Sequence, residues 1–128
     1  MRRPTPRLED DLRAASRAYP LSVSEDRRWV TVHRFKLPPG YRRSTTDILM
    51  EIPRDYPCTP PGVSTHVYID ASLRFHGRKL RDVYEGVNPG WGNWAWLCYH
   101  SIKWDPRRDD LVRFLEMVRA DLTEPKTK

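Results

Sequence analysis

Apolar residues recur at helical spacing near each end of the chain. Near the N-terminus four of them share one helical face: Leu8, Leu12, Ala15 and Tyr19. Thr5 followed by Pro6 is typical of an N-cap and a first helical residue, and Pro20 cannot continue a helix. These signals predict a helix over residues 6–18.

The second helical pattern lies near the C-terminus. Its apolar face is formed by five residues: Leu111, Phe114, Leu115, Val118 and Leu122. Asp105 followed by Pro106 repeats the signature of an N-cap and a first-position proline, with Asp109 and Asp110 in the first turns. We therefore predict a helix over residues 106–122.

Between these two segments the pattern changes to short runs rich in β-branched and aromatic residues. Three runs predict strands: "RWVTVHRFKL" (28–37), "TDILMEI" (46–52) and "VSTHVYI" (63–69). A fourth run, "LRFHGRKL" (73–80), predicts either a further strand or a hairpin around Gly77. This order predicts an α+β fold in which the two helices pack on an antiparallel meander sheet of about four strands.

Two segments fit neither helix nor strand. "PRDYPCTPPG" (53–62) holds four prolines in ten residues, so we predict an ordered or extended connector. "DVYEGVNPGWGNWAWL" (82–97) contains two turn signals and several aromatic residues, which predicts a loop folded onto the core or built for function. Cys98 follows this loop directly, in a stretch that holds three of the five tryptophans.

The composition adds limits. The 128 residues suit one domain, with a basic leader (1–6), a folded core (7–122) and a polar tail (123–128). Hydrophobic content of 38% with 11% aromatic residues is too high for a disordered chain. We expect a cytoplasmic protein, because there is no apolar run near the roughly 20 residues of a membrane span and no apolar stretch of a secretory signal at the N-terminus.

The net charge of +6 is concentrated in one part of the chain. Residues 1–43 hold eleven Arg or Lys and five Asp or Glu, whereas residues 44–128 hold twelve of each kind. A basic N-terminal third would suit nucleic acid or an acidic partner protein, and a solvated surface is the plainer alternative.

Cysteine is the residue type that decides the candidate chemistry. Cys58 and Cys98 do not make a disulfide framework in a chain of this length, and a reducing cytosol disfavours a bridge between them. No CxxC, HExxH or clustered Cys/His pattern and no glycine-rich phosphate loop is present, so we expect neither a metal nor a cofactor. Cys98 is then either a packed thiol among aromatic residues or a nucleophile.

The order of elements, together with three motifs, resembles the ubiquitin-conjugating enzyme (UBC) fold. "IPRDYPCTPPGV" (52–63) resembles the P-x-x-Y-P-x-x-P-P connector after the second strand of that family. Cys98 follows about forty residues later, close to the family's usual distance for its nucleophile, and "WDP" (104–106) resembles the Trp-x-Pro at the start of the next helix. The resemblance covers roughly residues 8–122.

Two departures narrow the resemblance. The chain has no His-Pro-Asn motif before the cysteine, and it lacks the two further helices that often follow the Trp-x-Pro helix. Both features look like the divergent bacterial branches, in particular the prokaryotic group E of UBC-like proteins. There, small conjugating enzymes accompany a ThiF-like activating enzyme, a ubiquitin-like modifier and a JAB-type metallopeptidase, in operons thought to serve immunity, including antiphage defence, or stress.

The resemblance implies that Cys98 accepts the modifier as a thioester and passes it to a protein target. His100 would share a face with Cys98 in an extended segment, where it would stabilise the thiolate or deprotonate the nucleophile; a structural histidine is the alternative. Asn88 and Asn93, both also ordinary turn residues, compete with backbone amides for the role of oxyanion donor. Cys58 is expected to be structural or incidental.

The resemblance also implies partner contacts. Arg13 and Arg17 of the first helix, together with Arg2 and Arg3, would form a cationic dock for the activating enzyme or a ligase. Trp91, between two glycines, is the tryptophan that we most expect to be exposed to a modifier's tail, although burial is the simpler expectation. The other tryptophans near the cysteine are expected to pack: Trp94, Trp96 and Trp104.

Three other functions stay open. The first is an inactive UBC-fold protein that binds a modifier and does not need Cys98. The second is a nucleic-acid-binding protein, which eighteen arginines and five tryptophans would suit, but the excess charge lies far in sequence from the Trp-rich loop. The third is an unrelated cysteine hydrolase, for which the sequence offers no third orienting group.

Overall fold

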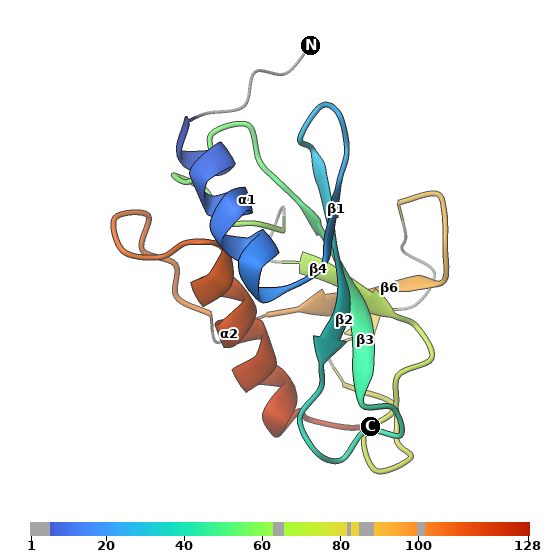
Figure 1. Ribbon diagram of the computed structural model, residues 1–128. Coiled ribbons are helices and arrows are strands. Elements are labelled where there is room, and N and C mark those ends of the chain that lie inside the picture. The colour runs from blue at the N-terminus through green and yellow to red at the C-terminus, as the bar shows by residue number, and fades with distance from the viewer. Residues whose placement is uncertain (1–5, 63–65, 82, 85–88, 100–101) are drawn as a thin grey trace.

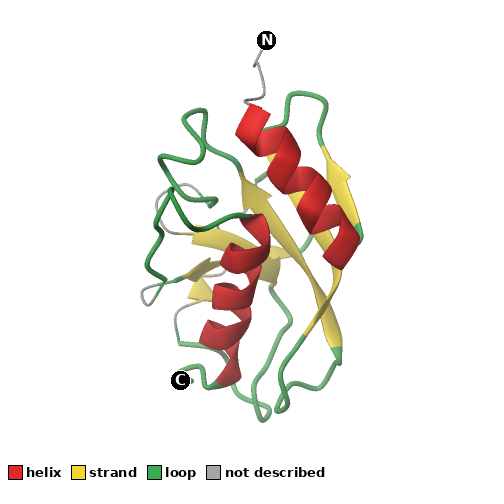
Figure 2. Cartoon of the chain, turned by 60° about the vertical axis from the view of Figure 1, so that its left-hand side comes forward, coloured by secondary structure: helices red, strands yellow, loops and turns green. Residues whose placement is uncertain are grey.

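Two helices lie on one face of an antiparallel sheet (Figures 1 and 2). The computed structural model describes residues 6–62, 66–81, 83–84, 89–99 and 102–128. α1 spans Pro6–Ala18 and α2 spans Leu111–Thr123, with 13 residues in each helix. In the described part of the chain no helix combines the length and apolar character that crossing a membrane requires. The predicted α+β class and the bounds of the first helix are confirmed.

The described sheet has six strands in the order β1-β2-β3-β4-β6-β5, and every pairing between neighbours is antiparallel. Their bounds are β1 Leu21–Val23, β2 Trp29–Lys36, β3 Thr45–Glu51, β4 His66–Asp70, β5 Val83–Tyr84 and β6 Trp94–Cys98. The three predicted strands correspond to β2, β3 and β4, which follow one another as the expected meander.

The predicted number of about four strands was too low. Most of β6, the strand that ends at Cys98, was predicted as a loop. β1 and β5 have three and two residues, which is too short for a periodic signal. β6 has the sequence "WAWLC", with half-buried Trp94 and Trp96 alternating with buried Ala95 and Leu97. This is the alternation of a strand, but the neighbouring glycines and the density of aromatic residues suggested a loop.

The run at residues 73–80 forms a tight turn and no regular strand. A single bridge joins Phe75 to Arg78, and His76 and Gly77 between them have positive φ angles of 49° and 77°. Gly77 adopts this region without strain, so the hairpin alternative was the better reading. The polar tail also pairs here, since the Arg81 backbone N–H donates to the Lys126 carbonyl at 2.7 Å.

The C-terminal helix begins at Leu111, five residues later than predicted. Pro106 opens a separate turn in which the N–H of Asp109 donates to the carbonyl of Asp105 at 2.8 Å. Asp110 is extended (φ −135°, ψ −173°), and its side chain accepts from the Arg113 N–H at 2.8 Å. Asp110 is therefore the N-cap, and the Asp105-Pro106 signature marks the preceding turn.

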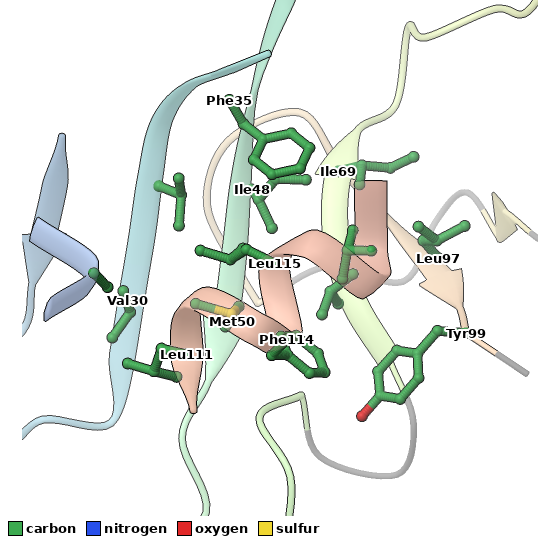
Figure 3. Packing of buried hydrophobic residues seen from close by; sticks show 14 of the residues in the cluster. Val30, Phe35, Ile48, Met50, Ile69, Leu97, Tyr99, Leu111, Phe114 and Leu115 are labelled. Carbon is green, nitrogen blue, oxygen red and sulfur yellow. The ribbon is translucent and has the colours of Figure 1, made fainter. Parts of the chain in front are cut away.

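The core lies between the helices and the sheet. Figure 3 shows side chains of β2, β3 and β4 meeting the apolar face of α2. Eight of the labelled residues are fully buried: Val30, Phe35, Ile48, Met50, Ile69, Leu111, Phe114 and Leu115. Because successive residues of a strand point to opposite faces, the residues between these core positions face away from the helices.

Replacing the cap tests the corrected helix start. Asp110→Ala should lower the free energy of unfolding by about 1 kcal/mol, because the Arg113 N–H loses its acceptor. Glu116→Ala, at an exposed position within α2, is the matched control and should change it by less than about 0.5 kcal/mol. Urea unfolding followed by circular dichroism measures both, and equal effects would argue against Asp110 as the cap.

Candidate functional site

Cys98 is the last residue of β6 and lies directly opposite His66 of β4. The preceding residue, Leu97, belongs to the core on the helix side, and its partner in the register is the core residue Val67. Alternation therefore places Cys98 and His66 together on the face away from the helices. Cys98 is 9% exposed. The sequence placed this cysteine between a loop and a helix, whereas it ends a paired strand.

His66 is the residue near Cys98 that sequence analysis missed. Its imidazole stacks on the indole of Trp96, with ring centroids 4.0 Å apart and an interplanar angle of 17°. Its Nδ1 atom is buried and makes no hydrogen bond. His66 lies opposite Cys98 only because of the register between β4 and β6. This neighbour could be predicted from the sequence only if "WAWLC" were first recognised as a strand.

The same face of the sheet carries a row of aromatic side chains that leads away from His66. The rings of Tyr68 and Trp96 lie 6.4 Å apart, and those of Trp29 and Tyr68 lie 6.1 Å apart. Trp91 meets Trp29 edge-on, with centroids 5.1 Å apart. Trp91 is 47% exposed, so it is exposed as its place between two glycines suggested, and the simpler expectation of burial was wrong. Trp94 and Trp96 are half-buried as packing predicts.

One arginine lies among these aromatic residues although the sequence separates the basic region from the Trp-rich segment. The guanidinium of Arg28 lies 5.2 Å from the ring centroid of Trp29, which itself contacts Trp91. Its Nε also donates to Glu51 Oε2 at 2.8 Å. Because a carboxylate already balances this cation, the arrangement gives little support to phosphate binding.

The residue after Cys98 is anchored on the opposite side of the sheet. The buried hydroxyl of Tyr99 donates to the carbonyls of Pro61 and Gly62, at 2.7 and 3.1 Å. Its ring packs edge-on against Phe114 of α2, with centroids 5.4 Å apart (Figure 3). Burial raises the pKa of Tyr99, so the hydroxyl keeps its proton and remains a donor. Cys98 is thus followed immediately by a residue whose side chain is held by hydrogen bonds and ring packing.

The proline-rich connector holds the segment that continues from the cysteine. The indole N–H of Trp104 donates to the carbonyl of Pro57 at 2.7 Å. The ring of Trp104 also packs between Tyr56 and Phe114, at centroid distances of 5.9 and 6.1 Å. The expectation that Trp104 packs is confirmed, and the two motifs of the resemblance, "YPCTPP" and "WDP", contact each other.

A buried carboxylate on α1 joins both motifs to the helix layer. Asp11 is 7% exposed, and its Oδ2 accepts from the Tyr56 hydroxyl at 2.5 Å and from Arg7 Nε at 2.9 Å. Arg7 also donates through Nη1 to the Pro106 carbonyl at 3.0 Å and through Nη2 to the Asp109 carbonyl. Burial, together with the bond to Asp11, raises the pKa of Tyr56.

Of the other predicted catalytic residues, the structure describes only Asn93. His100 and Asn88 lie outside the described residues. Asn93 precedes β6, so the length of the strand separates it from Cys98 by roughly 16 Å, and its carbonyl accepts from the Ala71 N–H at 2.9 Å. The structure therefore does not support Asn93 as an oxyanion donor. Cys58 is exposed in the connector.

The predicted partner residues on α1 are free to meet solvent. Arg13 and Arg17 are both exposed, and the side chain of Arg13 is 3.6 Å from an equally exposed Asp10. Arg2 and Arg3 lie outside the described residues. Across the described ranges, no group of three or more His, Cys, Asp or Glu side chains is placed to hold a metal ion.

Removing the Tyr56 hydroxyl tests how much its hydrogen bond to the buried Asp11 carboxylate stabilises the protein. Tyr56→Phe should lower the free energy of unfolding by about 1–3 kcal/mol, because a buried carboxylate loses one of its donors. Tyr84→Phe, at a 50% exposed position, removes the same hydroxyl without a buried partner and should change little. Thermal and urea unfolding measure both, and indistinguishable values for the two variants would contradict the prediction.

Comparison with known proteins gives one match. A family model described as prokaryotic E2 family E matches residues 8–125. A search of curated proteins and a search of solved structures found no match. The matched range contains α1 except for its first two residues, all of α2, the whole described sheet, the connector and Cys98. The chain therefore belongs to prokaryotic E2 family E, a ubiquitin-conjugating-like family.

Proposed function

We propose that the protein is a conjugating enzyme that carries a ubiquitin-like modifier as a thioester on Cys98 and passes it to a target nucleophile. A ThiF-like activating enzyme would supply the modifier, and a JAB-type peptidase would remove it. The observation that carries the proposal is the placement of Cys98 within a chain of this family: it ends β6, next to a histidine, and is followed by the Tyr99 anchor.

The chemistry needs two acyl transfers. In the first, the Cys98 thiolate attacks the carbonyl carbon of the modifier's C-terminal thioester on the activating enzyme, and the enzyme's thiolate leaves. In the second, an amine of the target attacks the new thioester, loses its proton, and expels the Cys98 thiolate. Each transfer passes through an oxyanion that requires hydrogen-bond donors. We propose backbone amides near Cys98 as these donors. The roles of His100 and Asn88 stay predictions from the sequence.

The low exposure of Cys98 shapes the proposal. Cys98 is 9% exposed, so little of the residue is open to a large acyl donor in the free protein. Neighbouring atoms must move when the activating enzyme or the modifier binds, so loading should depend on contacts remote from the thiol. The same observation favours the alternative of an inactive protein that binds a modifier without chemistry, and the adduct experiment below distinguishes them.

A reconstituted loading reaction tests the thioester. Incubated with its activating enzyme, its modifier and ATP, the protein should form an adduct that a thiol reductant removes. Cys98→Ala should abolish the adduct, whereas Cys58→Ala should leave it in place, because Cys58 lies apart in the connector. Cys98→Ser should give a slower adduct that resists reductant, since it contains an oxyester.

The same gel assay can contradict the proposal in two ways. An adduct that survives Cys98→Ala would move the nucleophile elsewhere. No adduct under conditions in which the modifier still binds, as measured by calorimetry, would favour the binding-protein alternative.

Charge reversal on α1 tests the proposed dock for the activating enzyme. Arg13→Glu with Arg17→Glu should slow thioester loading by about tenfold or more at low salt, because attraction between opposite charges accelerates association. The control reverses the same number of charges at exposed positions away from α1, Arg42→Glu with Arg78→Glu. Equal slowing of both variants would show an effect of net charge alone, and an unchanged rate in the α1 variant would exclude the dock.

A further inference from the structure

We propose that His66 is the proton partner of Cys98: it takes the proton of the thiol and holds the resulting thiolate as an imidazolium–thiolate pair. The inference rests on the proposed role of Cys98 as the nucleophile. It differs from the expectation for His100, because it uses a histidine that is distant in sequence and adjacent in the sheet.

The register places the two side chains together. His66 and Cys98 are direct partners in the β4–β6 pairing, at the end of a ladder that continues through five consecutive pairs. Directly opposed residues of antiparallel strands have Cβ atoms about 4.5–5.5 Å apart and point to the same face. Both residues are held by backbone hydrogen bonding of the sheet, so their proximity does not depend on a flexible loop.

The surroundings of the imidazole favour this role. Trp96 stacks on the ring at 4.0 Å and fixes its orientation, and an indole face attracts an imidazolium more strongly than a neutral imidazole. The buried Nδ1 has no hydrogen-bond partner, although a buried polar nitrogen that serves only structure is normally satisfied. Because Nδ1 has no hydrogen-bond partner in the structure, the transfer requires the imidazole and the Cys98 thiol to close to hydrogen-bond contact.

Besides Glu51, the described strands place Asp47 and Asp70 on this face, farther along β3 and β4. Asp47 lies 3.7 Å from His33, and Asp70 lies 3.1 Å from Arg43. Extending the β3–β4 register by two residues brings Glu51 in line with His66. Glu51 is already paired with Arg28 at 2.8 Å, which reduces its influence on the imidazole. The phenols of Tyr68 and Tyr84 lie beside Trp96 on β4 and β5. Cys98 is the nucleophilic neighbour of His66 among these groups.

The proton balance is simple. The Cys98 S–H bond breaks, its proton moves to a ring nitrogen of His66, and the electron pair stays on sulfur as the thiolate. After the thiolate attacks the incoming thioester, the imidazolium can pass its proton to the departing thiolate of the activating enzyme. When an amine later attacks the thioester, neutral His66 takes the proton that the amine nitrogen loses, and the Cys98 thiolate leaves beside the imidazolium. No oxidant or reductant is needed.

The direct test is the pH profile of thiol alkylation. In the Cys58→Ser background the only thiol is Cys98, and mass spectrometry follows its reaction with iodoacetamide from pH 5 to 10. Burial slows the absolute rate, but the midpoint of the profile still reports when the thiolate forms. We expect a midpoint below the roughly 8.5 of a free thiol, and His66→Gln should raise it by about one pH unit or more.

Two comparisons exclude a merely structural effect. His33→Gln removes a histidine on the same face of β2, whose Nε2 lies 2.6 Å from Ser22 Oγ, and should leave the midpoint unchanged. The converse experiment needs no change at His66: an NMR titration of its imidazole should show a lower midpoint in Cys98→Ala than in the parent, because the neutral methyl no longer favours the imidazolium.

The outcomes separate this inference from the proposed function. If neither the alkylation midpoint responds to His66→Gln nor the imidazole titration responds to Cys98→Ala, the pairing is refuted, even when a thioester forms on Cys98. If both midpoints shift but no Cys98-dependent adduct forms with the activating enzyme, the pair stands and the proposed function fails. A midpoint that moves equally in His33→Gln also counts against His66.

Discussion

The interaction on which the site depends most is the burial of Asp11 between Tyr56 and Arg7. A carboxylate that is 7% exposed must be satisfied by donors, and these two come from the connector and from its own helix. Arg7 then extends the constraint to the carbonyls of Pro106 and Asp109, which lie in the turn before α2. One buried charge on α1 therefore places two segments, one far before and one shortly after Cys98, which no continuous strand or helix connects.

The contacts of Asp11 and Arg7 hold the segments around Cys98 in place on the helix side of the sheet. The opposite face, to which Cys98 points, is left for partners. The anchors of Tyr99 on Pro61 and of Trp104 on Pro57 lie on the side of α2, where Phe114 packs against both rings. Cys98 points to the opposite face, beside the stacked pair of His66 and Trp96. The sheet thus separates the anchoring residues Tyr99 and Trp104 from Cys98 and His66, which would react. Side chains on the face of Cys98 can therefore move when a partner binds while the anchors stay in place.

Local sequence patterns were sufficient to predict the elements that depend on residues close together in the chain. The bounds of α1, the apolar stripe of α2 and the ordered connector follow from periodicity and proline positions. The start of α2 was misjudged because two aspartates, Asp105 and Asp110, both suit a cap, and only the turn at Pro106 decides between them. β6 and its register were missed because pairing with β4 is a long-range choice. His66 became a candidate only through that register, so no motif of the chain could have revealed it.

The proposed nucleophile is the less exposed of the two cysteines. Cys58 is exposed, and the nearby carboxylate of Asp55 in the connector already accepts from the Thr59 hydroxyl at 2.8 Å. Cys98 is nearly buried, but the sheet opposes it with an imidazole whose Nδ1 is unsatisfied. Reactivity follows the thiolate, and a low-exposure thiol with a proton acceptor is protected from small oxidants until a partner opens the face. A protein that carries a modifier only between two partners gains from such protection, which makes the burial of Cys98 compatible with a role in transfer.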